Sequence, residues 1–367
     1  MLVFVDSFEG WSGTGAATGV KKGWTFADTN TALRENISSF GSTSNPPPPI
    51  GARTGDRALY MKSRADNFGQ DSARFRVTFD DFDTMIVGFG WMVDDEENRS
   101  GIHNMASINF GNNTIIFLAQ WNQDTSKVSF SMSGFSDEIA PGVYDGQTWI
   151  YVEMKVFVHP VNGYAEARIE GETVATFSGN TDIAGTGVAD SFIVHSGNNN
   201  APIQSLGGAF WFDDVIVMNG EGSQNNDFVG PVSIVASVPN GIGSVVEWEP
   251  VPGVDNYLNV DELPNDDADY VFSLGEVSDL HEMQDVNASS ILGIQTCIRG
   301  KKNIGKGKQF KNLLQPVSTI YDNGAAHIVG ITHVWKLDIF ETNPETSQPW
   351  TGDEYDATRA GYKVVEP

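Results

Sequence analysis

The 367-residue sequence predicts an all-β protein, in which a β-sandwich precedes a smaller β-rich domain with a short C-terminal helix. Three observations support this fold class. Apolar and polar residues alternate with a period of two in many short segments, and helical periodicity is nearly absent. Clusters of Gly, Asn and Asp separate these segments about every 8 to 14 residues, which is typical of a sandwich of two sheets.

The stretch 207–219, GGAFWFDDVIVMN, shows the alternation best and marks the end of the first domain. Phe210 and Phe212 point to one side of the expected strand, whereas Trp211 and Asp213, followed by Val215 and Val217, point to the other. A Gly- and Asn-rich stretch follows, and a new strand pattern starts after it. The sequence therefore predicts a sandwich over 1–222, a junction over 223–230 and a second domain over 231–367.

In the first domain, residues 4–11 are expected to form a short strand that runs into a turn. A Gly-rich region follows, with the run Pro46–Pro49, which we interpret as a stiff surface connection. The other expected strands are 58–61, 73–79, 85–93, 105–110, 114–121, 127–132, 148–158, 163–170, 172–177, 190–195 and 210–218.

In the second domain, strands are expected at 232–238, 244–248, 269–273, 291–298, 308–314, 317–321 and 332–340. Thr351 as N-cap, acidic residues after it and Gly361 as a stop predict the short helix.

Charge and composition exclude several classes. With 22 Lys and Arg against 48 Asp and Glu, the net charge of −26 repels nucleic acid and anionic membranes. No apolar run approaches the ~20 residues of a membrane helix, and the N-terminus lacks the features of a signal peptide. We therefore expect synthesis in a cytoplasm, no membrane insertion and no nucleic-acid partner. The single cysteine, Cys297, lies between apolar residues and is expected to be a buried thiol outside any disulfide.

Two resemblances extend this interpretation. The opening residues 4–11, FVDSFEGW, and the closing residues 210–217, FWFDDVIV, resemble the ends of a concanavalin A-like (laminin-G-like) jelly roll, which implies that the first and last strands pair. Residues 226–235, 257–262, 269–272 and 340–350 resemble a pattern of virion structural proteins of tailed bacteriophages.

The second resemblance implies a virion structural component at the tail tip or fibre, displaying a glycan-binding sandwich, and not an enzyme. It also implies a virion location after synthesis in the host cytoplasm, a homo-oligomer, and contacts with other virion proteins and a host cell-surface glycan. Two alternatives stay open: a head (capsid) decoration protein, and a polysaccharide-degrading glycosidase. A glycosidase needs two facing carboxylates, and Glu166 and Glu170 are the candidates.

Candidate binding residues follow from residue type. Loop polar groups and one strand aromatic could contact a glycan, although turns also favour Asn and sandwich cores favour Trp. These are Asn98, Arg99, His103, Asn104, Asn112, Asn113 and Trp121. A basic, Gly-rich turn could dock on an acidic neighbouring subunit or could be a solvated loop. Its residues are Arg299, Lys301, Lys302, Lys306 and Lys308.

No cofactor is expected apart from a candidate structural calcium ion. Asp213 and Asp214, with Asp6 and Glu9 from the paired first strand, could supply its oxygen ligands, or could be surface acids. The six histidines show no zinc-binding spacing.

Overall fold

The computed structural model describes 1–9, 22–26, 37–39, 51–62, 74–93, 101–111, 114–132, 138–144, 146–197, 209–263, 267–303, 308–324 and 326–366. The chain divides into two compact units, Met1–Ile234 and Val235–Pro367. The division follows Ile234, later than the junction that the sequence analysis placed at 223–230. Each unit is described separately.

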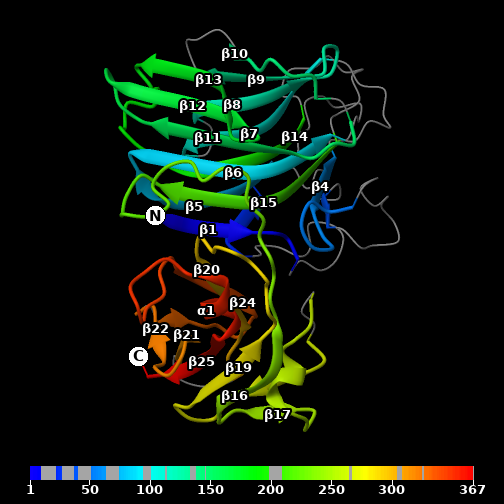
Figure 1. Ribbon diagram of the computed structural model, residues 1–367, viewed down its shortest axis with the longest axis vertical. Helices are drawn as coiled ribbons and strands as arrows, with labels where there is room; N and C mark the ends of the chain where they lie inside the picture. The colour runs from blue at the N-terminus through cyan, green and yellow to red at the C-terminus, as the bar shows by residue number, and fades with distance from the viewer. Residues whose placement is uncertain are drawn as a thin grey trace. The chain divides into compact units, whose positions relative to one another are not determined.

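The first unit is a sandwich of two antiparallel sheets that lie face to face (Figure 1). We call the first the β6 sheet; its strand order is β13-β12-β11-β6-β15-β4-β3, with β1 also paired to β15. Its strands are β1 (Leu2–Asp6), β3 (Ile37–Ser39), β4 (Leu59–Lys62), β6 (Thr84–Val93), β11 (Ile150–Phe157), β12 (Gly163–Ile169), β13 (Glu172–Gly179) and β15 (Ala209–Asn219).

The second sheet, called the β7 sheet, has the strand order β10-β9-β8-β7-β14-β5-β2. Its strands are β2 (Trp24–Phe26), β5 (Arg74–Phe82), β7 (Ile102–Phe110), β8 (Thr114–Asn122), β9 (Lys127–Met132), β10 (Glu138–Ile139) and β14 (Ala189–Gly197). The predicted all-β jelly-roll sandwich is confirmed. The expected pairing of the first and last strands is also present, with Val5 opposite Ile216.

Aromatic rings from both sheets fill the space between them. The Phe192 ring of the β7 sheet lies 5.7 Å from that of Phe89 in the β6 sheet, and Phe89 lies 6.1 Å from Phe212. All three side chains are fully buried. Because each buried aromatic removes about 150–250 Å² from water, these rings are a major source of stability.

A β-bulge interrupts the alternation of β15. Asp214 has a left-handed backbone (φ 48°), and the pairing with β6 shifts between Asp213 and Ile216. Val217 consequently pairs with Val87 and faces the core, and the expectation that it lies on the side of Trp211 is wrong. A bulge adds one unpaired residue and reverses the faces beyond it, so a strict period of two fails here.

The second unit contains a six-stranded antiparallel sheet, β16-β19-β25-β21-β22 with β23 paired to β21, and two strand pairs, β17-β18 and β20-β24. The strands are β16 (Pro239–Val246), β17 (Glu249–Val251), β18 (Tyr270–Phe272), β19 (Ser278–Met283), β20 (Ile294–Gly300), β21 (Gln309–Gln315), β22 (Tyr321–Asp322), β23 (His327–Ile328), β24 (Val334–Phe340) and β25 (Arg359–Val365). A 3-10 helix, η3 (Asn256–Asn259), and the helix α1 (Gly352–Asp356) complete it.

The short helix is confirmed, but its end is not where the sequence suggested. Thr351 and Glu354 form a capping box at its start, as the N-cap pattern predicted. Gly361, expected as the stop, instead lies within β25, where an added Cβ would come 1.9 Å from the carbonyl oxygen of Asp279. The glycine therefore permits close approach of β25 to β19.

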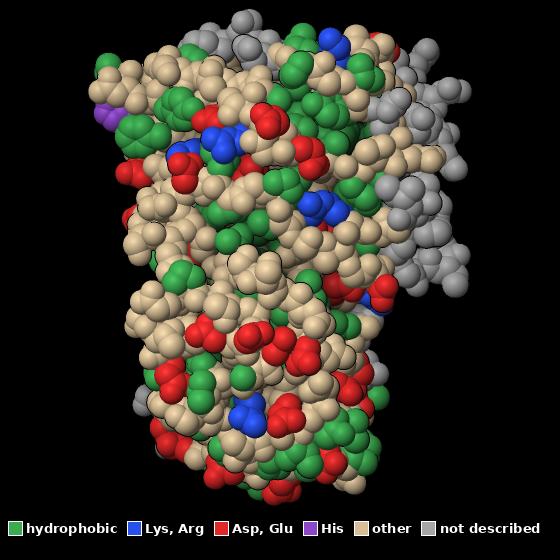
Figure 2. Space-filling view, in the orientation of Figure 1, with side chains coloured by type: hydrophobic (Ala, Val, Ile, Leu, Met, Phe, Trp, Pro, Cys, Tyr) green, Lys and Arg blue, Asp and Glu red, His purple; other side chains and the backbone are tan. Residues whose placement is uncertain are grey.

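Two other expected strands differ. No strand covers 232–238, and only Tyr321–Asp322 of the 317–322 region is a strand. Figure 2 shows acidic side chains distributed over the visible surface, in keeping with the net charge of −26. No helix in the described part of the chain is long and apolar enough to span a membrane.

Candidate functional site

The outer face of the β7 sheet carries a row of polar side chains that crosses five strands. On β14, Phe192 faces the core, so Ser191, Ile193 and His195 face away from it. His195 pairs with Arg74 on β5. On the other side of β14, Asn104 of β7 lies opposite Gly197, two residues after His195. Gln120 of β8 lies opposite Asn104, and Ser129 of β9 lies opposite Gln120. We call Arg74, His195, Asn104, Gln120 and Ser129 the polar row.

The polar row runs across five strands of the sheet, and its members His195, Asn104 and Ser129 are buried. Five adjacent strands span about 19 Å, since neighbouring strands lie about 4.8 Å apart. Within the row, Gln120 Nε2 donates to Asn104 Oδ1 (2.9 Å), and Gln120 Oε1 accepts from Ser131 Oγ (3.5 Å), which lies on β9 beside the row. These amide and hydroxyl groups can exchange hydrogen bonds with the hydroxyls of a sugar chain.

His195 is oriented by two further polar side chains. Ser107 Oγ lies 2.8 Å from His195 Nε2. The Asn109 amide is satisfied when its Nδ2 donates to Ser107 Oγ (2.6 Å) and faces the carbonyl oxygens of Ser107 and Ile108 at 3.2 and 3.3 Å. The Ser107 hydroxyl then donates to Nε2, and the ring proton lies on Nδ1.

This arrangement leaves a buried donor without a protein acceptor. His195 is 1% exposed, and its Nδ1 has no hydrogen-bond partner within the described residues. Burial, with a smaller contribution from the positive charge of Arg74, lowers the pKa of His195 to about 3. The imidazole is therefore neutral at pH 7, and its Nδ1–H can donate a hydrogen bond to an anionic or hydroxyl oxygen.

Only one expected glycan contact lies in the polar row. Asn104 is there, but His103 and Trp121 lie between the two sheets, with ring centroids 5.9 Å apart and both near Phe210. The expectation that His103 and Trp121 contact a glycan is wrong, because both side chains point into the core. Four other expected contacts, Asn98, Arg99, Asn112 and Asn113, lie outside the described residues.

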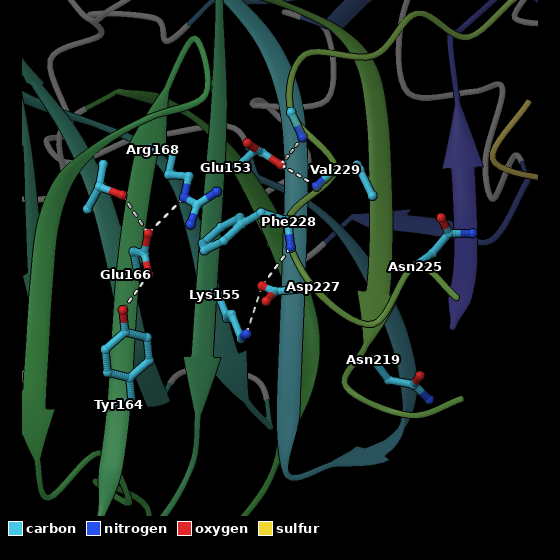
Figure 3. A network of polar contacts seen from close by, with 12 residues as sticks. Glu153, Lys155, Tyr164, Glu166, Arg168, Asn219, Asn225, Asp227, Phe228 and Val229 are labelled. Atoms are coloured by element: carbon cyan, nitrogen blue, oxygen red, sulfur yellow. Dashed lines mark hydrogen bonds and ion pairs between the residues drawn. The ribbon is translucent and has the colours of Figure 1, made fainter. Parts of the chain in front are cut away.

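The carboxylates considered for glycoside hydrolysis are not placed for it. Glu166 accepts hydrogen bonds from Tyr164, from Arg168 Nε (2.7 Å) and from Thr173 Oγ1 (2.7 Å), and these donors outweigh burial and lower its pKa (Figure 3). Glu170 occupies a turn with φ 51° and accepts from the backbone N–H of Tyr151 (2.5 Å). A glycosidase acid must hold a proton until it meets the leaving oxygen, and Glu166 is held ionised.

The four acids considered for calcium are engaged by protein donors. Asp6 accepts from the Trp24 indole N–H (3.0 Å), and Glu9 accepts from the backbone N–H of Asp56 (2.8 Å). Asp213 accepts from the backbone of Arg53 (3.0 Å), and Asp214 pairs with the Arg53 side chain. Among the described residues, no group of three or more His, Cys, Asp or Glu side chains is arranged to hold a metal ion. These residues do not fit a calcium site.

Residues of the basic turn make ion pairs within the second unit. Arg299 pairs with Asp267 and Lys308 pairs with Glu366, while Lys301 is exposed and Lys302 is half-buried. Lys306 lies outside the described residues. Cys297 is exposed, which corrects the expectation of a buried thiol: on β20 it is the neighbouring Thr296 that is buried.

His195, Ser107 and Asn109 were not identified from the sequence. The available signal was their position in the alternation of each strand. Ser107 and Asn109 alternate with apolar residues on β7, and His195 does so on β14, which predicts that they face away from the core. Polar residues in the outward phase are ordinary in a sandwich, so nothing distinguished these before the register brought them together.

No family model matches the chain, and a search of curated proteins gives no match. An endo-β-1,4-glucuronan lyase from the fungus Trichoderma reesei resembles it at 12% identity, covering 60% of this chain and 96% of that chain, with a TM-score of 0.41. An alginate lyase variant bound to an alginate trisaccharide matches at 13% identity over 52% of this chain and 90% of that one (TM-score 0.36). A structure from work on endo-acting O-glycanases of the human gut microbiota covers 60% and 99% at 12% identity (TM-score 0.38).

The likeness is one of fold alone: the three similar structures are a glucuronan lyase, an alginate lyase and a protein from work on O-glycanases, and none of the three is a virion component. The expected role as a tail or head component of a phage virion is corrected accordingly, as is the expectation that the chain is not an enzyme. The sequence resemblance to virion proteins over 226–235, 257–262, 269–272 and 340–350 stays untested.

Proposed function

We propose that the first unit is a polysaccharide-degrading enzyme whose substrate lies along the polar row. The observation that carries this proposal is His195 Nδ1, a buried donor without a partner among the described residues, in a row with Arg74 and with amide and hydroxyl groups. A buried polar group that the protein leaves unsatisfied is costly, and such groups are most often explained by a function.

The row favours elimination over hydrolysis. It contains no carboxylate, whereas hydrolysis of a glycosidic bond ordinarily needs two. In elimination from a uronate, a base removes the proton on the carbon that bears the carboxyl group. The electrons of that C–H bond form a carbon–carbon double bond, and the glycosidic oxygen leaves and takes up a proton. The step succeeds when the negative charge that develops on the carboxyl group is stabilised.

His195 and Arg74 supply groups suited to this stabilisation. The neutral imidazole can donate Nδ1–H to one carboxyl oxygen, and Ser107 and Asn109 keep the ring in the tautomer that does so. Arg74 adds positive charge at the neighbouring position of the row. A carboxylate between these two groups is therefore the chemical feature that the site would select.

The test is depolymerisation of a panel containing glucuronan, alginate, mucin glycans and a neutral glucan. Reducing ends report any cleavage, and ultraviolet absorbance of the unsaturated sugar reports elimination. We expect both signals on a uronate polymer, and at least a hundredfold loss in His195→Ala. His159→Gln is the control, because His159 lies outside the polar row and its Nδ1 accepts from the backbone of the turn that follows it. Cleavage that persists in His195→Ala, or that occurs only on the neutral glucan, would refute the proposal.

A further inference from the structure

The segment 227–234, which we call the strap, lies against the outer face of the β6 sheet and ends where the first unit ends. In Figure 3, Asp227, Phe228 and Val229 of the strap face side chains from neighbouring strands of that sheet. The strap contains no strand although its sequence alternates. Its backbone donors are instead bound by carboxylates.

Two buried carboxylates hold the strap by its main chain. Glu153 Oε1 accepts the N–H groups of Val229 (3.1 Å) and Gly230 (3.0 Å), and Asp214 Oδ1 accepts that of Ile234 (2.7 Å). Glu153 is 1% exposed and Asp214 fully buried. Glu153 Oε2 has no hydrogen-bond partner among the described residues, so only one of its two oxygens is used.

Cationic side chains complete the attachment. Lys155 Nζ lies 2.9 Å from Asp227 Oδ1, and the Arg168 guanidinium lies 4.1 Å from the centre of the Phe228 ring. The Arg53 guanidinium donates to the carbonyl oxygen of Val232. Ion pairing and cation–π contact therefore reinforce the carboxylate bonds along the length of the strap.

The buried carboxyls under the strap have raised pKa values, whereas hydrogen bonding and pairing with Lys155 lower the pKa of Asp227 in the strap itself. Burial raises the pKa values of Glu153 and Asp214, and burial with the neighbouring Asp214 raises that of Asp213 to about 8. A proton on Glu153 can occupy the unused Oε2 and leave Oε1 free to accept the strap. The other titratable or charged groups that face the strap or its carboxylates are Arg53, Tyr151, Lys155, Glu166, Arg168, Asp227 and the α-amino group of Met1, which bonds the backbone of Asn219, Glu221 and Asn225.

We propose that the strap is a pH-dependent latch that stays closed in acid and is released as the pH rises, lengthening the tether to the second unit. When Glu153 loses its proton, its Oε2 becomes a buried anionic oxygen without a hydrogen-bond partner among the described residues, and release of the strap lets water reach it. Release frees the chain from Asp227 to Ile234, which adds up to about 27 Å of extended chain.

Hydrogen exchange tests the latch on the whole chain from pH 5 to pH 9, corrected for the intrinsic pH dependence of exchange. Glu153 has one pKa when the strap is closed and a lower one when it is released. In the pH range between these two values, the equilibrium constant for opening at the Val229 and Gly230 amides should rise by up to tenfold per pH unit. In Glu153→Gln, which keeps the acceptor oxygen and cannot ionise, that rise should be lost. Glu172→Gln, on an exposed position of β13, is the matched control and should behave as the natural sequence does.

Three results would overturn the proposal: opening that does not vary with pH, an unchanged pH dependence in Glu153→Gln, or a parallel rise at core amides of β6 and β11. The last would mean unfolding of the sheet and not release of the strap. Chymotrypsin gives a second readout on the natural sequence, because cleavage after Phe228 requires the ring to leave Arg168. Cleavage there should accelerate with pH relative to a flexible peptide carrying the same residues.

Discussion

The proposed site makes a quantitative prediction about acid stability through His195. The pKa of its imidazole falls from 6.5 in the unfolded chain to about 3 in the folded one, chiefly because the ring is buried. A group with a depressed folded pKa contributes stability above its unfolded pKa, and that stability is lost as the pH falls. Lowering the pH from 7 to 5 should therefore remove the contribution of His195 to the stability of the first unit.

The magnitude depends little on the exact folded value. At pH 5 the unfolded imidazole is almost fully protonated, and the folded one is not protonated for any pKa well below 5. Below the unfolded pKa of 6.5, each pH unit costs about 1.4 kcal/mol, so almost the whole loss of about 2 kcal/mol between pH 7 and pH 5 falls below pH 6.5. Other groups titrate in the same window, and a variant must separate their contribution.

Urea unfolding at pH 7, 6 and 5 measures this loss in the natural sequence and in His195→Gln. The variant should be less stable at pH 7 by about 1–3 kcal/mol, because Ser107 loses its partner. Between pH 7 and pH 5, the unfolding free energy of the variant should nevertheless lose about 2 kcal/mol less than that of the natural sequence, since the variant lacks the titrating group. Equal pH dependences in the two proteins would mean that His195 is protonated in the folded state at pH 5, and the argument from its buried, neutral ring would fail.

Four further predictions concern the fold. Phe212→Ala, at a fully buried position, should cost about 3–5 kcal/mol in unfolding free energy, measured by urea denaturation. Gly88→Ala places a Cβ 2.5 Å from the Tyr151 hydroxyl and should cost about 1–3 kcal/mol in the same assay; Tyr151→Phe in the same chain should restore part of it. Trp350→Ala in the second unit should cost about 3–5 kcal/mol by thermal denaturation, because its ring is buried and its Nε1 donates to Phe340. Stability contributed by protonated Asp213 should decline as the pH rises from 3.8 to about 8, and Asp213→Asn should remove that slope from the pH profile of unfolding.

The sandwich could be predicted from the sequence because alternation is a local property. Phe75 and Val77 were expected to face inward and Arg74 and Arg76 outward, and the burial of the first pair agrees. The closing strand could be predicted as far as Asp213. Beyond it, one left-handed residue at Asp214 shifts the register, and nothing in a run of Asp, Val and Ile distinguishes a bulge from a regular strand.

The candidate site could not be predicted because it depends on register between strands far apart in the chain. Ser107 and His195 are 88 residues apart in sequence and meet only because β7 and β14 are neighbours with a particular offset. The strap was missed for a related reason. Its alternation at 232–238 correctly indicates extended chain, but whether extended chain pairs with a strand or with buried carboxylates is decided by the surface that it meets.

The measurement that tests the account most directly is depolymerisation of a uronate polysaccharide by the natural sequence beside His195→Ala and His159→Gln. Unsaturated products from the natural sequence and from His159→Gln, with almost none from His195→Ala, are the predicted result. Full activity without the imidazole, or no cleavage of any acidic polymer by the folded protein, would contradict the assignment of the polar row as the functional site.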